Sequence, residues 1–516
     1  MAFFYKLLKN DIGGNFGLLI RNMYSKAEVA VRLQGGLTDY FNTTIGVKQG
    51  CVLSPTLFKL FVNDMPDIFG PGCHPATLYL ESINCLLFAD DVILVSESED
   101  GLQVALDNLM KYCNDWMLEI NPDKTKVMIF NKSGKKLSSY KFKIKNQDLE
   151  VADSSTYLGI TFNANGSLKN AITNLCKKAM KAMFKLRSAV FNTNMNPKTA
   201  LFLFDSLIRP IATYGSEVWG AFLNDIPDMF NINSSKLNTD NMSFEKLDLK
   251  FCKYILGVHR KASNLGSRGE LGRFPISLHI TKMMIKYWLR MTDYNKNTLL
   301  YDAYLCNLEL LGDNKNCWLK NIHDIIRNKL GAKHLWENQG TSGENIKQIT
   351  PLYNKLKYIY EFQWANAKNK NENKNNEGNK LRTYNKFKKQ FNYEAYLDFE
   401  PDFRKRRNIT RLRISAHHLE IETGRYKMKN GKKIPPDERL CKTCNAVEDE
   451  YHLIMNCKTH DKERSELLDK VNETFPDFPN IDDKEKFLFL MSCNDYELYM
   501  YVRKFMDEVV HKRGTI

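Results

Sequence analysis

The chain has 516 residues, 43% of them hydrophobic and 12% aromatic, so most of it can fold, and its length predicts roughly two to four domains. An excess of 75 Lys and Arg over 60 Asp and Glu gives a net charge of +15 and a pI near 9.0, which favours a polyanionic partner. No apolar run approaches the roughly 20 residues of a membrane span, and 12 scattered cysteines without a signal peptide favour a reduced intracellular protein.

The first part of the chain predicts helices and then a hairpin. Residues 3–24 carry apolar side chains at helical spacing on both sides of Gly13 and Gly14, which predicts two helices with a glycine break. Residues 28–45 alternate between apolar and polar side chains, which predicts a hairpin that turns at Gly35 and Gly36.

A glycine-containing loop, GVKQGCVLSP, comes next. Ser54 is expected to cap the following helix, with Pro55 at its first position. Gly46 and Gly50 allow the backbone to approach a ligand closely, and Gln49 offers both a donor and an acceptor. The alternative is a plain loop at the start of a helix.

Two adjacent carboxylates, Asp90 and Asp91, stand between two apolar runs in LLFADDVILV, residues 86–95. The runs predict two strands, which places both acids at the tip of a hairpin where they can point the same way. A divalent cation would neutralise such a pair, and oxygen ligands of this kind suit Mg²⁺. The alternative is an ordinary acidic turn.

Helices dominate the expectations for the rest of the chain. An amphipathic helix is expected at 101–116, a strand at 127–130, and helices from 167 to about 214 whose polar face carries basic residues. Such a lysine face can follow a nucleic-acid backbone or be simply solvated. Residues 276–364 are helix-rich with buried apolar stripes, and residues 366–380, rich in Asn, Lys and Glu, predict a disordered hinge.

A dense basic cluster follows the expected hinge. It can bind nucleic acid, serve as a nuclear import signal or form a solvated face. Its members are Arg404, Lys405, Arg406, Arg407, Arg411 and Arg413.

A C-x2-C-x7-H-x4-C motif near the C-terminus predicts a Zn²⁺ site. Two cysteines two residues apart form a turn that presents both sulfurs to one ion, and a later His and Cys complete a tetrahedral set. The expected ligands are Cys441, Cys444, His452 and Cys457, with His460 as a spare.

GVKQGCVLSP and, about 30 residues later, FADD together resemble reverse transcriptases, in particular those of non-LTR retrotransposons. LEINPDKTK at 118–126, YLGI at 157–160, and the segments 209–220, 269–275 and 439–457 extend the resemblance. It implies an RNA-directed DNA polymerase with an RNA template, a DNA target and primer, and deoxynucleotide triphosphates as its partners.

The same resemblance implies roles for individual residues. Asp90 and Asp91 would hold Mg²⁺, and Lys124 would lie near the phosphates of the nucleotide and assist catalysis. A primer grip is implied at Tyr157, Leu158 and Gly159. Nucleotide or template contacts are implied for Gln49, Gly50, Ser54, Pro55, Phe88 and Ala89.

The expected fold is α+β, with five parts. These are a partial polymerase palm with an antiparallel sheet at 1–162, a helical thumb and connection at 163–300, a helical region at 301–365, the hinge at 366–380, and a basic C-terminal domain with the zinc site at 381–516.

The sequence departs from the family pattern at its start. The family supplies one essential Asp from a strand upstream of the first helix seen here, and Asp11 lies in the wrong place to replace it. Two-metal phosphoryl transfer needs carboxylates that clamp both ions. We therefore expect a truncated, inactive copy; the alternative is a non-catalytic RNA- or DNA-binding protein. Either would work in the nucleus and cytoplasm, without a membrane.

Overall fold

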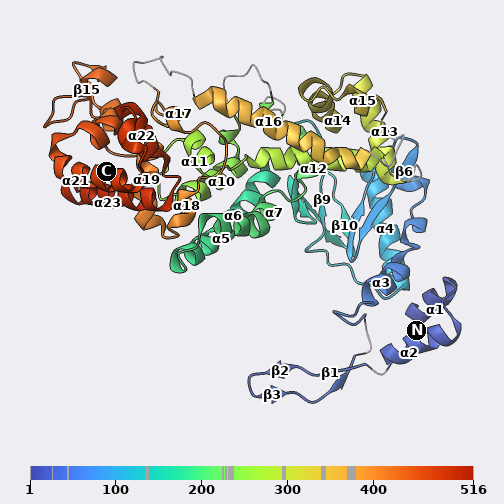
Figure 1. Cartoon of the computed structure of the whole chain (residues 1–516). Coiled ribbons are helices and arrows are strands. Elements are labelled where there is room, and N and C mark those ends of the chain that lie inside the picture. Colours follow the sequence, from blue (N-terminus) through green and yellow to red (C-terminus); the bar gives the residue numbers. More distant parts are fainter. Residues whose placement is uncertain are drawn as a thin grey trace. The chain divides into compact units, whose positions relative to one another are not determined.

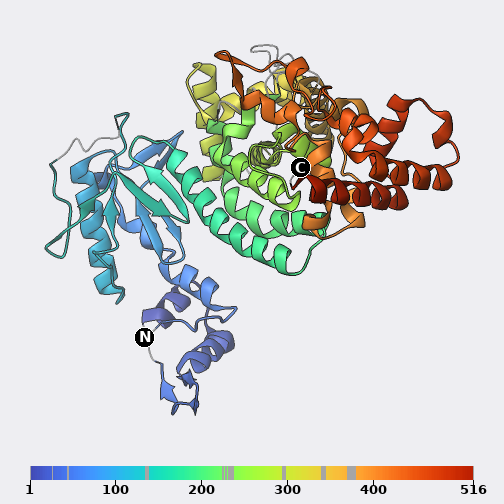
Figure 2. The same ribbon diagram turned by 90° about the vertical axis from the view of Figure 1, so that its left-hand side faces the viewer.

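The protein is described by a computed structural model that covers residues 2–25, 27–43, 46–133, 139–223, 226, 229–230, 238–292, 298–338, 345–368 and 379–514. It divides into two compact units, Met1–Ser167 with Lys296–Cys306, and Leu168–Asn295 with Asn307–Ile516. The N-terminal unit is shown from a second side in Figure 2. No helix among the described residues is long and apolar enough to cross a membrane.

The N-terminal unit begins with the two expected helices, α1 (Ala2–Lys9) and α2 (Gly14–Ser25). Lys6 fastens α1 to the rest of the unit, because its buried Nζ donates to Asp64 Oδ1 at 2.6 Å and to the Tyr112 hydroxyl at 2.5 Å. Burial lowers the pKa of Lys6 against the opposing effect of Asp64. A buried ammonium needs such partners, so this contact fixes the position of α1.

The hairpin expected at 28–45 is confirmed where it is described. β1 (Glu28–Val29) pairs with β4 (Phe41–Asn42), and β2 (Arg32–Leu33) pairs with β3 (Gly36–Leu37), both antiparallel. Ile45, which the expected hairpin includes, lies outside the described residues.

The expected single antiparallel sheet is instead a set of two-stranded sheets. The antiparallel pairs are β5 (Ala76–Leu78) with β6 (Glu81–Ile83), β7 (Cys85–Phe88) with β8 (Asp91–Leu94), β10 (Lys143–Ile144) with β11 (Gln147–Asp148), and β13 (Ser154–Tyr157) with β14 (Ile160–Asn163). The prediction of a strand at 127–130 is wrong. The observed strand β9 (Lys126–Val127) has only two residues, which pair in parallel with the two residues of β12 (Glu150–Val151).

Helix α4 (Glu99–Asp115) is the core element of this unit and confirms the amphipathic helix expected at 101–116. Ser98 caps it, since its hydroxyl accepts from the Gly101 N–H at 3.1 Å. Its apolar face packs beneath the β7–β8 hairpin and against α3 (Ser54–Val62), and Figure 2 shows the helix alongside the hairpins. The buried residues of α4 are Gly101, Ala105, Leu106, Leu109, Tyr112 and Cys113.

The second unit is almost entirely helical (Figure 1). Its first helices confirm the helical pattern expected from 167 to 214: α5 (Lys169–Asn192), α6 (Pro197–Leu203) and α7 (Arg209–Ala212). The next are α8 (Ser216–Trp219), α10 (Ser243–Ile255), α11 (Asn264–Glu270), α12 (Ile276–Thr292), α14 (Trp318–His323), α15 (Lys333–Glu337) and α16 (Ile349–Lys368). Helix α13 (Leu299–Gly312) spans the division between the units.

The C-terminal part of this unit is helical as well. It comprises α17 (Tyr384–Phe387), α18 (Tyr396–Phe399), α19 (Phe403–Arg413), α20 (Glu420–Thr423), α21 (Asp461–Thr474), α22 (Asp483–Ser492), α23 (Tyr496–Arg513) and the hairpin β15 (Met428–Lys429) with β16 (Lys432–Lys433). The apolar stripe expected in α12 is core, since Ile285, Trp288 and Leu289 are at most 2% exposed.

Buried ion pairs join the helices of this unit. Arg268 of α11 donates to Glu245 at 2.6 Å and to Asp248 at 2.9 Å, both on α10. Arg413 of α19 binds Glu270 of α11 at 2.9 Å. Residues 379–514 belong to the same compact unit as residues 168–292.

The expected hinge at 366–380 differs at its start, because α16 continues through Lys368. Lys368 is itself buried, with its Nζ over the Trp364 ring at 4.1 Å. Residues 369–378 lie outside the described residues.

Candidate functional site

The paired carboxylates stand at the tip of the β7–β8 hairpin, as expected. Phe88 pairs with Asp91 across the strands, which leaves Ala89 and Asp90 as a two-residue turn. Ala89 has φ +53°, the left-handed conformation that such tight turns require. Asp90 and Asp91 are both exposed, while Leu87 and Val92 pack on the core of α4. The core therefore holds the hairpin, and the turn presents the carboxylates to solvent.

The exposed pair fits the chemistry of a magnesium ligand set. Mg²⁺ is commonly held by one or two carboxylates together with substrate phosphates. Within the described residues, no third acidic, His or Cys side chain lies with Asp90 and Asp91 in a three-ligand cluster.

Tyr157, expected in the primer grip, lies within electrostatic reach of this pair. Its pKa is raised by partial burial and then by the negative charge of Asp91. Leu158 at φ +46° and Gly159 at φ +82° form the two-residue turn between β13 and β14. The two tight hairpins thus carry Asp91 and Tyr157, which interact electrostatically.

The loop before α3 has the glycine geometry expected of it, but its serine acts differently. Gly46 and Gly50 have φ of +81° and +80°, and Gln49 is exposed. Ser54 is the first residue of α3 rather than its cap. Its hydroxyl donates a hydrogen bond to the Lys48 carbonyl at 2.6 Å. The cap position is Leu53, which has no side-chain oxygen, so Ser54 instead closes the loop onto the helix.

The remaining residues expected near the nucleotide are exposed. Lys124 lies in a turn in which its N–H donates to Asn121 Oδ1 at 3.2 Å. Phe88 is 60% exposed, and Pro55 and Ala89 are exposed too. In the described part of the chain, neither Gln49 nor Lys124 hydrogen-bonds to Asp90 or Asp91.

The four expected zinc ligands come together in the second unit. One ligand atom from each of Cys441, Cys444, His452 and Cys457 lies within 4.8 Å of the others. The Cys444 and Cys457 sulfurs are 4.0 Å apart, close to the ~3.8 Å that tetrahedral Zn–S bonds of about 2.3 Å require. Because Cys457 takes part, the spare ligand His460 is not needed.

Local contacts prepare this cluster for a metal. His452 is 5% exposed and its Nε2 has no hydrogen-bond partner in the described structure, as expected of a nitrogen kept for an ion. The Lys458 N–H donates to Cys444 Sγ at 3.4 Å and lowers the pKa of that thiol, whereas burial raises the pKa of Cys457. The donor set fits a structural Zn²⁺ ion.

The basic cluster on α19 does not form one surface, which corrects the expectation for two of its members. Arg406 is 1% exposed and donates to the carbonyls of Glu400, Pro401 and Ile255. Arg413 is equally buried among Glu270 and Glu394. Their guanidinium groups stabilise the fold. Arg404, Lys405 and Arg407 are exposed, and Arg411 is half-buried.

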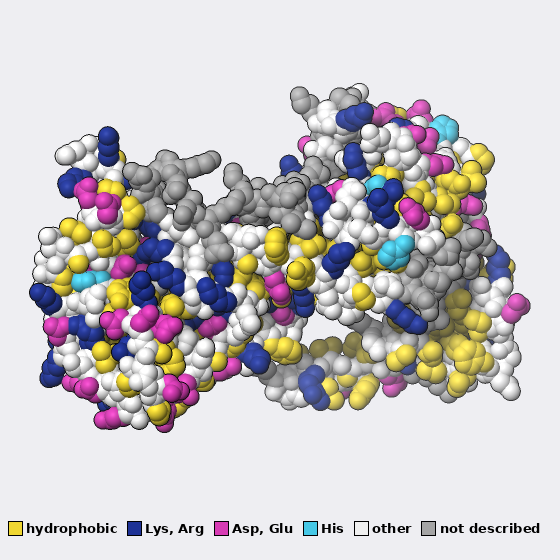
Figure 3. All heavy atoms as spheres, turned by 45° about the horizontal axis from the view of Figure 1, so that its top comes forward, with side chains coloured by type: hydrophobic (Ala, Val, Ile, Leu, Met, Phe, Trp, Pro, Cys, Tyr) yellow, Lys and Arg dark blue, Asp and Glu magenta, His cyan; other side chains and the backbone are white. Residues whose placement is uncertain are grey.

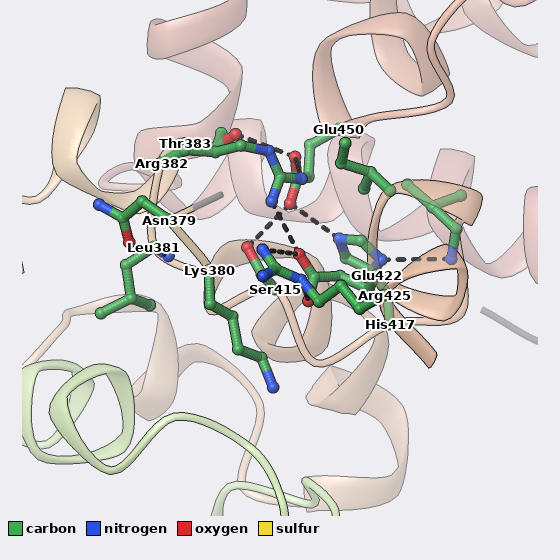
Figure 4. Close-up of polar contacts among 12 residues, drawn as sticks. Asn379, Lys380, Leu381, Arg382, Thr383, Ser415, His417, Glu422, Arg425 and Glu450 are labelled. Carbon is green, nitrogen blue, oxygen red and sulfur yellow. Dashed lines mark hydrogen bonds and ion pairs between the residues drawn. The ribbon is translucent and has the colours of Figure 1, made fainter. Parts of the chain in front are cut away.

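A buried polar network, which the sequence analysis did not identify, supports the cysteine cluster (Figure 4). Glu450 is fully buried and accepts from Arg382 at 2.7 Å, Thr383 at 2.9 Å, Ser415 at 2.8 Å and His417 Nε2 at 2.8 Å. The segment after residue 378 is thereby joined to the cluster segment. In the sequence, the acidic run at 448–450 between the two ligand pairs was the one feature that pointed to this network.

Comparison with known proteins identifies the N-terminal region. The sequence profile of reverse transcriptase (RNA-dependent DNA polymerase) matches residues 5–162, which include both tight hairpins and the loop before α3. Residues 5–162 are therefore similar to reverse transcriptases.

The relatives that it resembles include RNA-directed DNA polymerases of mobile elements and a Pol polyprotein of a retrotransposable element. The chain is 27% identical to the probable RNA-directed DNA polymerase from transposon BS of Drosophila melanogaster, over 42% of this chain and 23% of that protein. It is 25% identical to the polymerase from mobile element jockey of the same species, over 39% and 22%. With the Pol polyprotein from type-1 retrotransposable element R2 of Nasonia vitripennis it shares 30%, over 29% and 15%. The chain thus spans less than a quarter of each of these relatives.

Proposed function

We propose that this chain is part of an RNA-directed DNA polymerase that copies an RNA template from a DNA primer, with Asp90 and Asp91 as ligands of catalytic Mg²⁺. The observation that carries the proposal is the two-residue turn of β7–β8, which presents adjacent carboxylates within a reverse transcriptase region. Bound Mg²⁺ would supply charge stabilisation for phosphoryl transfer from a deoxynucleotide triphosphate.

The surrounding loops have matching roles in this proposal. Gln49 and Gly50, together with Pro55, Phe88 and Ala89, contact the nucleotide or the template, while Ser54 holds the loop in shape through Lys48. Lys124 meets the phosphates of the nucleotide. Tyr157, Leu158 and Gly159 hold the primer end, and the electrostatic reach from Tyr157 to Asp91 supports this role.

The basic face of α5 is proposed to follow the template–primer backbone. Lys177, Lys178, Lys181 and Lys185 are all exposed along this helix. Phosphate contacts of this kind position a duplex without reading its sequence. A structural Zn²⁺ ion at the cysteine cluster would stabilise the C-terminal part of the same unit.

A polymerase site of this type needs more than the two acids. Because no third ligand stands beside Asp90 and Asp91 in the described residues, we expect this chain alone to bind template–primer without extending it. The test is extension of a labelled DNA primer annealed to RNA, with Mg²⁺ and all four deoxynucleotides, for the wild type and for the Asp90→Asn/Asp91→Asn variant. An unrelated reverse transcriptase on the same substrate is the positive control.

The assay has three informative outcomes. Equal background product from both proteins, with the wild type bound to the substrate, agrees with the proposal. Product that only the wild type makes would overturn the inactivity and keep the polymerase assignment. Failure to bind template–primer at all would contradict both.

A second candidate function is nucleic-acid binding without catalysis. The net charge of +15 and the exposed lysines of α5 favour it. It predicts affinity for RNA and DNA that falls steeply as salt rises, whereas binding that salt does not change would contradict it.

A further inference from the structure

Helix α5 packs beside α10 in the second unit (Figure 1). Residues of these two helices line an aromatic pocket that has no role in the proposed polymerase site. The cavity has a volume of about 330 Å³. It is lined by Phe184, Arg187, Ser188, Phe191, Asn192 and Tyr254.

Two phenylalanines of this pocket stay open to solvent. Phe184 is 49% exposed and Phe191 is 47% exposed, although phenylalanine is usually buried. They are seven residues apart on α5, so two helical turns bring them to the same side. Phe403 of α19 supports Phe191 and Tyr254, with its ring centroid 6.3 Å from that of Phe191 and 5.6 Å from that of Tyr254. The rings are therefore held in place rather than loosely exposed.

Cations lie over the aromatic faces. The Arg187 guanidinium is 4.0 Å from the centroid of Tyr254, and Lys250 Nζ is 4.8 Å from that of Phe184. Arg404 lies 5.0 Å from the Phe191 ring and also pairs with Asp402. The six lining residues, all within the described structure, include one cation and no acid. Such a pocket favours a ligand that is both aromatic and negatively charged.

Further basic groups continue from the pocket along the end of α10 and the exposed edge of α19. Gly257, just beyond α10, lies so close to Phe403 and Arg407 that an added Cβ would meet the Arg407 Cβ at 2.9 Å. Arg411 Nε donates to the Gly257 carbonyl at 3.2 Å, and Lys380 Nζ donates to that of Lys261 at 3.2 Å. We call this set the basic belt: Lys253, Arg260, Lys261, Lys380, Arg407 and Arg411.

His259 lies beside the belt, within electrostatic reach of its cations. Burial and the nearby charges of Lys380, His418, Arg411 and Lys253 lower the pKa of His259 to about 4. Burial lowers the pKa of Lys253, and the negative charge of Asp240 opposes this effect. Figure 3 shows Lys and Arg side chains gathered on one face of the part that contains the C-terminal helices.

We propose that the aromatic pocket and the basic belt form a binding site for single-stranded nucleic acid, in which an unpaired base stacks in the pocket and the adjoining phosphates lie on the belt. Stacking on protein rings is open to bases of a single strand, whereas a duplex keeps its base faces covered. The site does not depend on polymerisation, since none of its residues belongs to the proposed metal or nucleotide site.

The test is fluorescence anisotropy with a labelled 20-nucleotide oligouridylate and with a blunt RNA–DNA duplex of the same length. We expect the Phe184→Ala/Phe191→Ala variant to bind the single strand roughly 5- to 100-fold more weakly and the duplex within about twofold of the wild type. Phe202→Ala is the matched control, because Phe202 is also exposed, at 68%, but lies on α6 outside the pocket.

Two further variants separate stacking from charge and from misfolding. Phe184→Trp keeps an aromatic face and should retain single-strand binding. Arg260→Gln/Arg407→Gln should reduce the slope of log K against log salt by about 1.4, since each lost phosphate contact removes about 0.7. Unchanged single-strand binding in the double alanine variant, or equal loss for strand and duplex, would overturn the proposal. Absence of single-strand binding by the wild type would overturn it too.

Discussion

Glu450 shows how one residue fixes the place of a whole segment. Its carboxylate is fully buried and accepts from four side chains, which come from the segments at 379–383 and 415–417. Burial raises its pKa, but Arg382 and His417 outweigh burial, so the pKa of Glu450 lies well below its ordinary value of 4.5. The ionised form therefore stabilises the folded state.

Replacing this carboxylate should destabilise the protein in a pH-dependent way. We expect Glu450→Gln to lower the free energy of unfolding by about 3 kcal/mol at pH 7, since it leaves Arg382 partly unpaired. A carboxyl whose pKa is depressed on folding stabilises above pH 4.5, and that contribution is lost as the pH falls further. The difference between variant and wild type should therefore shrink in urea titrations below pH 4.5.

A surface carboxylate serves as the control for this prediction. Glu466 pairs with Lys504 at 3.4 Å and is 45% exposed, so Glu466→Gln should cost less than about 1 kcal/mol. A Glu450→Gln variant no less stable than this control would contradict the account.

At the scale of elements, the cysteine segment is held by its ligands more than by regular structure. Cys441 N–H donates to the Ala446 carbonyl at 2.7 Å, Asn445 N–H donates to the Cys441 carbonyl at 2.9 Å, Asn445 has φ +52°, and a short bridge joins Leu440 to Val447. A metal bound at this turn would add to its order.

Loss of the cysteines should remove zinc and loosen this segment. We expect about one Zn²⁺ per wild-type chain by elemental analysis, and none in Cys444→Ser/Cys457→Ser. Chelation should raise hydrogen exchange in residues 439–460. Cys306→Ser, which changes a half-buried thiol outside the cluster, should keep its zinc. Equal zinc content in both variants would contradict the assignment.

Elements set by local pattern were predictable, and those set by distant partners were not. The β7–β8 and β13–β14 turns follow from short strands around residues that allow tight turns. The strand at 127–130 failed because β12 pairs with 126–127 alone. Arg406 and Arg413 looked like surface charge because their partners Ile255 and Glu270 lie 151 and 143 residues away.

At the scale of the whole molecule, sequence motifs predict the candidate sites, whereas contacts between distant residues determine which segments pack together. The zinc motif and the paired acids could be read from the sequence, because ligand types at fixed spacing carry their chemistry with them. The inclusion of residues 379–514 in the same unit as residues 168–292 could not be predicted, since it depends on ion pairs such as that of Arg413 with Glu270. The aromatic pocket was hidden for the same reason: α5, α10 and α19 contribute to it together.

The central claim is that residues 5–162 hold the primer end of a template–primer. Photocrosslinking tests it most directly, with 4-thiothymidine as the 3′-terminal nucleotide of a DNA primer on RNA and the crosslinked peptides identified by mass spectrometry. The account predicts crosslinks within residues 85–94 or 154–163, the two hairpins that bring Asp91 near Tyr157. A crosslinker placed 15 nucleotides back along the primer should move the signal out of both hairpins. Crosslinks from the 3′ end confined to residues 168–516 would contradict the account.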